Sequence, residues 1–82
     1  MDYSVRTPGQ LGLILRSRRR QRRQTQKAAG ARSGLKQATV SAAEAAAGRT
    51  SVETLFKLLS ALDLELVLRE KGAPSGASER EW

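Results

Sequence analysis

Hydrophobic residues recur at helical spacing near the start of the chain. Leu11, Ile14 and Leu15 fall on one face of a helix and form an apolar stripe. Pro8 suits the first turn of that helix, and Thr7 is its expected N-cap, because a threonine hydroxyl accepts a backbone N–H left unpaired there. We therefore expect the first helix to begin at Pro8.

A second and denser stripe of helical spacing begins after position 51. Thr50 and Glu53 match a capping box, so we expect Thr50 at the N-cap with Glu53 reaching back to it. Phe56 is the only phenylalanine, and we expect it to anchor the core. This helix should form the main wall of the core, through Val52, Leu55, Phe56, Leu58, Leu59 and Leu62.

The spacing changes from helical to alternating in residues 63–70. Leu64, Leu66 and Leu68 share one face of this segment, which indicates a half-buried strand. The chain offers no second strand candidate, and an unpaired apolar edge promotes aggregation. Pairing with the same segment of a second subunit removes that hazard and predicts a two-fold homodimer. Continuation of the preceding helix is the alternative, because leucine and glutamate are good helix formers.

Between the two helical stripes, residues 25–44 predict a short helix, a turn and a second short helix. Thr25 is a suitable N-cap, and Gly34 can adopt the left-handed conformation that ends a helix. The second short helix is expected to begin at residues 36–38. A helix, a glycine turn and a helix form the outline of a DNA-reading helix-turn-helix.

Positive charge is concentrated in the first part of the chain. The net charge is +7, and residues 16–23 contain six arginines in eight positions. A run this dense repels itself unless anions are present, and a phosphate backbone supplies them with strong salt dependence. A charged helix end, an arginine-rich RNA-binding segment and simple solubility are the alternatives.

Composition narrows the class of protein further. The 82 residues suffice for one small domain, with an arm at 1–7, a DNA-binding domain at 8–62, a dimerisation strand at 63–70 and a disordered tail at 71–82. Cysteine and histidine are absent, so we expect no catalytic residues, no metal site, no cofactor and no small-molecule ligand. No apolar run reaches about 18 residues, and we expect a cytoplasmic, nucleoid-associated protein without membrane contact.

The motifs of the chain resemble those of the lambda-repressor-like (XRE-type) helix-turn-helix family. Within that family, residues 36–41, the strand region and the final Glu81-Trp82 resemble HipB, the antitoxin of HipBA toxin–antitoxin modules. The residues that carry the family resemblance are Leu11-Gly12, Arg16, Arg19, Thr25-Gln26, Gly34, Ala38-Thr39-Val40-Ser41, Glu44 and Ser51-Val52-Glu53-Thr54-Leu55.

The resemblance implies a mainly α bundle with one C-terminal β-strand that pairs across a homodimer. It implies a repressor that binds palindromic double-stranded operator DNA of its own operon and neutralises a HipA-type serine/threonine kinase toxin. It also implies an Arg19–Glu44 salt bridge. The expected base readers are Lys36, Gln37, Ala38 and Ser41, because their chemistry suits base edges. The expected phosphate contacts are Gln26, Arg16, Arg20, Arg22, Arg23, Lys27, Thr39 and Arg49.

Trp82 and Glu81 are the expected toxin contacts, because an aromatic residue at the end of a polar tail is typical of an anchor for a partner's pocket. A chance tryptophan is the alternative. A transcriptional regulator without a toxin partner and an arginine-rich RNA-binding protein are the alternative functions.

The chain departs from the family pattern at several positions. Arg18 and Gln24 stand where apolar residues are usual, Ala42 replaces a frequent arginine, and Gly30 weakens the first short helix. Three small residues replace larger core side chains, and they are Ala29, Ser33 and Ala43. We therefore expect a loosely packed DNA-binding half that relies on a dimer or a partner.

Overall fold

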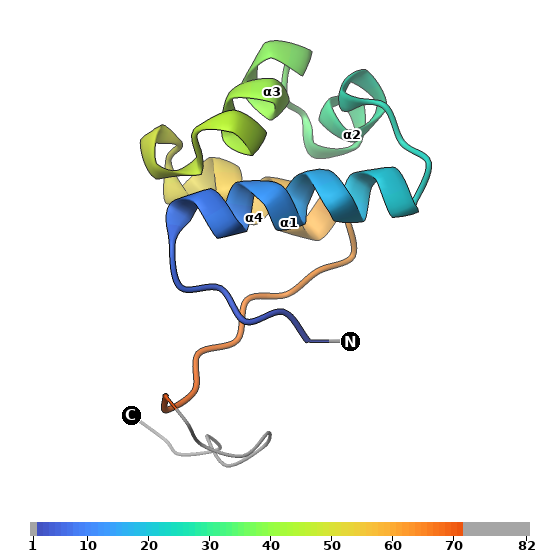
Figure 1. Cartoon of the computed structure of the whole chain (residues 1–82). Helices are drawn as coiled ribbons and strands as arrows, with labels where there is room; N and C mark the ends of the chain where they lie inside the picture. Colours follow the sequence, from blue (N-terminus) through green and yellow to red (C-terminus); the bar gives the residue numbers. More distant parts are fainter. Residues whose placement is uncertain (1, 72–82) are drawn as a thin grey trace.

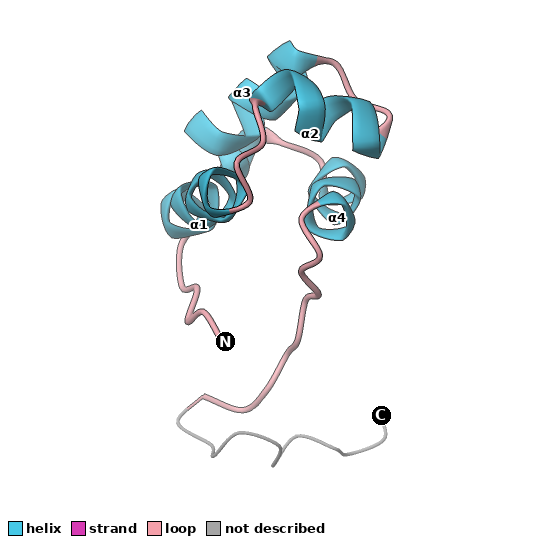
Figure 2. Ribbon diagram, turned by 90° about the vertical axis from the view of Figure 1, so that its right-hand side faces the viewer, coloured by secondary structure: helices cyan, strands magenta, loops and turns pink. Residues whose placement is uncertain are grey.

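The computed structural model describes residues 2–71, and these residues form four α-helices and one 3-10 helix. The elements are α1 (Pro8–Gln21), α2 (Gln26–Ser33), α3 (Gln37–Ala45), η1 (Ala47–Arg49) and α4 (Val52–Ala61). Helices α2 and α3 lie together above α1 and α4, and both terminal segments leave on the opposite side (Figures 1 and 2). The prediction of a mainly helical bundle is confirmed.

The first two helices begin where the sequence predicts. The Thr7 hydroxyl accepts the Gln10 N–H at 3.1 Å, with Pro8 in the first turn of α1. The Thr25 hydroxyl accepts the Ala28 N–H at 3.0 Å at the start of α2. Both threonines therefore satisfy a backbone donor that the helix itself leaves free.

The predicted capping box at the start of α4 is wrong by one residue. Ser51, and not Thr50, is the N-cap, and its hydroxyl accepts the Thr54 N–H at 3.1 Å. Glu53 does not reach back, because its carboxylate lies 3.5 Å from the Lys57 ammonium one turn further on. The helix is therefore capped by a hydroxyl as expected, but by Ser51 and without the reciprocal bond from Glu53.

The core lies where α1, α3 and α4 meet. Leu15 of α1 and Val40 of α3 are each 1% exposed. The inward face of α4 completes the cluster through Leu58, Leu59 and Leu62, with Leu11, Leu35, Leu55 and Leu64 packed around its edge. The expectation that α4 forms the main wall of the core therefore holds for its second half.

Phe56 is not the core anchor that the sequence predicts. Its side chain is 49% exposed, and Val52, one turn earlier, is 66% exposed. The inward face of α4 follows Leu55, Leu58, Leu59 and Leu62, so a residue next to Leu55 is turned roughly 100° away from the core. Two large apolar side chains of α4 thus remain at the surface.

The small residues of α2 and α3 produce close packing rather than a loose core. Ala29 and Ala43 are both 0% exposed. A Cβ at Gly30 would lie 2.6 Å from the Leu35 carbonyl oxygen, and a Cβ at Gly12 would collide with the Glu44 carbonyl. The helices approach each other closely because these positions have little or no side chain, so the expected looseness at these positions is wrong.

The segment after α4 turns away from the bundle. Asp63 adopts a left-handed conformation with φ of 54°, which ends the helix and rules out the helical alternative for this segment. Residues 64–70 are neither helix nor strand in the single chain, and Leu66 and Leu68 are exposed. Arg69 Nη1 lies 3.4 Å from Asp2 Oδ2, so this segment runs beside the N-terminal arm (Figure 2). The predicted strand pairing across a dimer stays a prediction.

Replacement of Gly30 by alanine should destabilise the fold, because its Cβ has no room beside Leu35. We expect Gly30→Ala to lower the free energy of unfolding by about 1–3 kcal/mol. Gly9→Ala is the matched control, since a Cβ there meets only the Thr7 hydroxyl at 3.9 Å. We expect it to raise stability by about 0.4–1 kcal/mol through the unfolded chain. Urea unfolding followed by circular dichroism measures both, and equal effects would contradict the close packing at Gly30.

Candidate nucleic-acid interface

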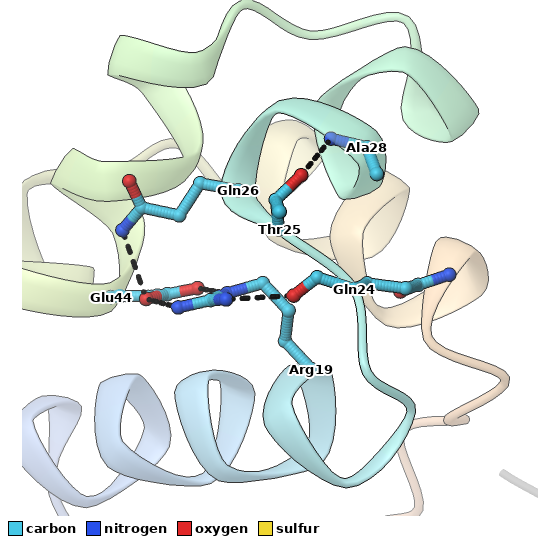
Figure 3. A network of polar contacts seen from close by, with 6 residues as sticks. All are labelled: Arg19, Gln24, Thr25, Gln26, Ala28 and Glu44. Atoms are coloured by element: carbon cyan, nitrogen blue, oxygen red, sulfur yellow. Dashed lines mark hydrogen bonds and ion pairs between the residues drawn. The ribbon is translucent and has the colours of Figure 1, made fainter.

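A buried ion pair joins α1 to α3 and orients the start of α2. Arg19 Nε lies 2.6 Å from Glu44 Oε2, and Arg19 Nη2 donates to Glu44 Oε1 at 3.1 Å (Figure 3). The two side chains are only 11% and 6% exposed. Arg19 Nη1 also donates to the Gln24 carbonyl, and Gln26 Nε2 donates to Glu44 at 3.2 Å. The implied Arg19–Glu44 salt bridge is therefore present.

The charges of this pair are stabilised by their surroundings. Burial alone raises the pKa of Glu44, but hydrogen bonds from Arg19 and Gln26 and the charges of Arg19 and Arg16 outweigh it, so its pKa lies below the ordinary value. The hydrogen bond to Glu44 raises the pKa of Arg19 further above its already high value. Both groups are therefore ionised at neutral pH and hold the helix-turn-helix in place.

The turn between α2 and α3 has the geometry that the sequence predicts. Gly34 ends α2 with φ of 73°, and its N–H donates to the Gly30 carbonyl. A Cβ at Gly34 would meet nothing within 4 Å, so the backbone conformation and not crowding favours glycine. After this turn, α3 packs against both α1 and α2.

The start of α3 presents hydrogen-bond donors to solvent. Lys36, Gln37 and Ala38 are exposed, and Ser41 one turn later is half-buried. Lys36 is the N-cap but makes no side-chain cap, unlike Thr7, Thr25 and Ser51 in the other α-helices described. The Thr39 N–H donates to the Lys36 carbonyl at 3.0 Å. No side chain caps the remaining N–H groups at the start of α3, and the exposed side chains at this end of the helix carry an ammonium and an amide group.

The predicted phosphate contacts occupy several elements. Arg16 and Arg20 are exposed one turn apart on α1, Lys27 is exposed at the start of α2, and Arg49 is exposed in η1. Arg23 is exposed in the turn after α1, with φ of 56°. Thr39 is half-buried in the first turn of α3. The nitrogen of the Gln26 amide is held by Glu44 in this state.

Arg22 has a different partner from the predicted phosphate. Its Nη2 lies 2.6 Å from Asp63 Oδ2, at the point where the chain leaves α4. Arg18 stands where the family usually has an apolar residue, and its Nε donates to the Leu62 carbonyl at 3.0 Å. The sequence analysis missed both roles, although the four-residue spacing of Arg18 and Arg22 places them on one face of α1.

The remaining predicted residues lie elsewhere. Leu64 is half-buried at the edge of the core, whereas Leu66 and Leu68 are exposed beyond it. Glu81 and Trp82, the expected toxin contacts, lie outside the described residues. Among residues 2–71, no helix is both long and apolar enough to cross a membrane.

A family comparison defines the class of protein. The model of the helix-turn-helix family HTH_3 matches residues 15–68, which include the ion pair, the turn and the start of α3. The chain therefore belongs to the XRE-type helix-turn-helix family of DNA-binding regulators. No curated protein matches the chain significantly.

Solved structures give the particular branch of this family. The chain matches a HipB variant in an O2 20-mer complex at 31% identity and a TM-score of 0.81, over 85% of this chain and 97% of that one. It matches a chain of a HipA–HipB–O2–O3 complex at 32% identity and a TM-score of 0.80, over 84% and 97% of the two chains. The predicted resemblance to HipB is confirmed.

Removal of the Glu44 charge should destabilise the fold in a pH-dependent way. We expect Glu44→Gln to lower the free energy of unfolding by about 3 kcal/mol at pH 7, because Arg19 then stays buried beside an uncharged partner. The folded pKa of Glu44 is depressed, so the stabilisation is complete above its unfolded value of about 4.3 and is lost as the pH falls through the folded value.

The stability difference between wild type and Glu44→Gln should therefore shrink in acid, as measured by urea unfolding between neutral pH and strong acid. Glu53→Gln is the matched control, because the Glu53 side chain is 80% exposed. We expect this control to change stability by no more than about 0.5 kcal/mol. A stability difference between wild type and Glu44→Gln that stays constant into strong acid would contradict a depressed pKa of Glu44 in the folded chain.

Proposed function

We propose that this protein is a dimeric DNA-binding antitoxin that represses its own toxin–antitoxin operon and neutralises a HipA-type serine/threonine kinase. The observation that carries this proposal is the exposed, donor-rich start of α3, a helix whose other end is held against α1 by the buried Arg19–Glu44 pair. The likeness to HipB in complexes with O2 and with HipA supports the choice of DNA and kinase as partners.

Base reading is assigned to the start of α3. An exposed glutamine amide can pair with adenine through two hydrogen bonds, and a lysine ammonium can donate to guanine. In this proposal Gln37 and Lys36 take these roles, Ala38 contacts a thymine methyl group, and Ser41 approaches the next base. Ala42, where the family often has arginine, is exposed but carries no polar group, so base contacts are few.

Affinity in this proposal comes mainly from phosphates. The exposed cations on α1, α2 and η1 neutralise phosphates, and each neutralised phosphate releases counterions. Arg16, Arg20, Arg23, Lys27 and Arg49 take this role, with Thr39 and Gln26 as neutral contacts. Gln26 would have to exchange its hydrogen bond to Glu44 for a phosphate oxygen, or share its amide between both.

Dimerisation is proposed through the segment that follows α4. Leu66, Val67 and Leu68 are between 54% and 71% exposed in the single chain, and α4 adds exposed Val52 and Phe56. Large apolar side chains at the surface of so small a domain favour an interface with a second copy. Pairing of residues 63–70 between subunits would also satisfy backbone groups that residues 64–70 leave outside helix and strand.

An RNA-binding function has less support than DNA binding. Of the six arginines in residues 16–23, Arg18, Arg19 and Arg22 are bound to Leu62, Glu44 and Asp63 within the fold. The run is therefore part of a packed helix and not a free arginine-rich peptide. A regulator without a toxin partner remains the alternative, and an experiment on the tail separates the two.

Loss of the Gln37 amide should weaken specific DNA binding more than non-specific binding. We expect Gln37→Ala to lose about 1–3 kcal/mol for operator DNA and nothing for unrelated DNA, because only the operator offers the paired base. Gln21→Ala, an exposed glutamine of α1, is the matched control and should change neither. Fluorescence anisotropy with both duplexes at one salt concentration measures this, and equal losses on both duplexes would exclude Gln37 as a base reader.

Removal of the last residues of the tail should weaken binding to the kinase without changing binding to DNA. We expect deletion of residues 77–82, or Trp82→Ala, to weaken binding to the co-expressed HipA-type kinase by about tenfold or more, because a buried aromatic anchor is lost. Ser78→Ala is the control, and operator affinity without kinase should not change. Unaltered kinase binding by the deletion variant would exclude the tail as the anchor, and absence of any kinase binding by the full chain would favour the stand-alone regulator.

A further inference from the structure

Helix α4 ends in a motif that depends on one unusual residue. The Leu64 N–H donates to the Leu59 carbonyl at 2.8 Å, and the Asp63 N–H donates to the Ser60 carbonyl at 3.1 Å. These two bonds, with Asp63 at φ of 54°, form a Schellman motif. Glycine is the usual residue at the left-handed position, so an aspartate there bears a conformational penalty that its side chain has to offset.

Helix α1 supplies the charges that the end of α4 lacks. The last turn of α4 contains no basic residue, although its unpaired carbonyls favour a cation. Arg18 Nε donates to the Leu62 carbonyl at 3.0 Å, and Arg22 Nη2 lies 2.6 Å from Asp63 Oδ2. One arginine thus caps the helix, and the other holds the aspartate at the turn.

The arginines of α1 therefore divide between different faces of the helix. Arg16 and Arg20 are exposed one turn apart, whereas Arg19 points to Glu44. Arg18 and Arg22 form a second pair, also one turn apart, whose partners lie where the chain runs away from α2 and α3 (Figure 1). This second pair has protein partners in place of phosphates.

We propose that Arg18 and Arg22 are positioning residues that fix the direction in which residues 64–70 leave the bundle. Arg18 binds the Leu62 carbonyl and Arg22 binds the Asp63 carboxylate. The next residue, Leu64, donates its N–H to the Leu59 carbonyl of α4. This inference rests on the proposed dimer, because a fixed exit aligns the segment for pairing with a second copy. Arg18 and Arg22 thus act on the dimer and not on DNA.

Substitution of Asp63 by glycine tests whether the carboxylate of Asp63, or only its backbone conformation, fixes the exit of residues 64–70. Glycine adopts a φ of 54° without penalty, so Asp63→Gly keeps the backbone turn and removes only the partner of Arg22. If the turn alone mattered, this variant would hold the exit at least as firmly as wild type. If the ion pair matters, Asp63→Gly should still loosen the exit, although by less than Arg22→Ala, because glycine also relieves the conformational penalty.

Two measurements on the full chain test the proposal. Hydrogen exchange reports the Leu64 N–H, and we expect it to exchange about threefold faster in Arg22→Ala and faster, by a smaller factor, in Asp63→Gly, with the Leu58 N–H unchanged. Sedimentation equilibrium reports the dimer, and because both subunits carry the change we expect its dissociation constant to rise about tenfold. Arg22→Lys keeps a cation for Asp63 and should restore most of both values.

Arg20→Ala is the matched control, because Arg20 is exposed on the same helix. We expect it to lower the salt dependence of DNA binding by about one phosphate contact without any change in Leu64 exchange, and Arg22→Ala to leave that salt slope unchanged. If Arg22→Ala lowers the slope as Arg20→Ala does and leaves Leu64 exchange unchanged, Arg22 is a phosphate contact and the proposal is overturned.

Failure of the proposed dimer would be visible separately. A wild-type chain that sediments as a monomer at all concentrations excludes the dimer, while Leu64 exchange still decides whether the ion pair fixes the exit. Slower Leu64 exchange in Asp63→Gly would show that only the backbone conformation matters and would overturn the role of the carboxylate. Should Arg22→Ala fail to fold, Asp63→Asn, which tolerates the left-handed turn, tests the same contact.

Discussion

The fold depends on the buried pair of Arg19 and Glu44. It joins the last turn of α1 to the end of α3, and Glu44 also accepts a hydrogen bond from Gln26 at the start of α2 (Figure 3). An ion pair this deeply buried contributes little net stability compared with an apolar pair, but loss of either partner leaves an uncompensated charge. Its main consequence is therefore geometric, because it fixes the orientation of α3 relative to α1.

The sequence predicted the elements with local signals and failed where the outcome depends on neighbours. Thr7, Thr25 and Gly34 are fixed by capping and turn chemistry within a few residues, and all three lie where they were expected. The prediction for Phe56 failed because periodicity identifies a broad apolar face of α4 but does not show which part of that face packs against α1 and α3. The prediction for Thr50 failed because the adjacent Ser51 is the better N-cap residue, a preference that the capping-box pattern with Glu53 concealed.

The candidate site shows the same division between local and long-range information. Lys36 and Gln37 were predicted as base readers from their place at the start of the second short helix, and both are exposed there. Ala29 and Ala43 were misread, because a small residue indicates either a void or a close approach, and only the folded chain decides between them. Gly30 was read only as a weak point of its helix, although its missing side chain makes room for Leu35 and Val40. The partners of Arg18 and Arg22 lie more than forty positions away, beyond any local pattern.

A run of like charges is therefore a poor guide to a single function. Arginines at positions 16–23 repel one another as a peptide, yet the helix distributes them over faces with different surroundings. Arg19 is neutralised by Glu44 and Arg22 by Asp63, while Arg18 meets a helix carbonyl. Because two of these charges are paired with carboxylates and the third is directed at the end of α4, fewer remain to attract phosphates than the composition suggests. The helix that carries the exposed arginines proposed to contact DNA thus also secures the end of α4, and only the direction in which each side chain points separates the two groups.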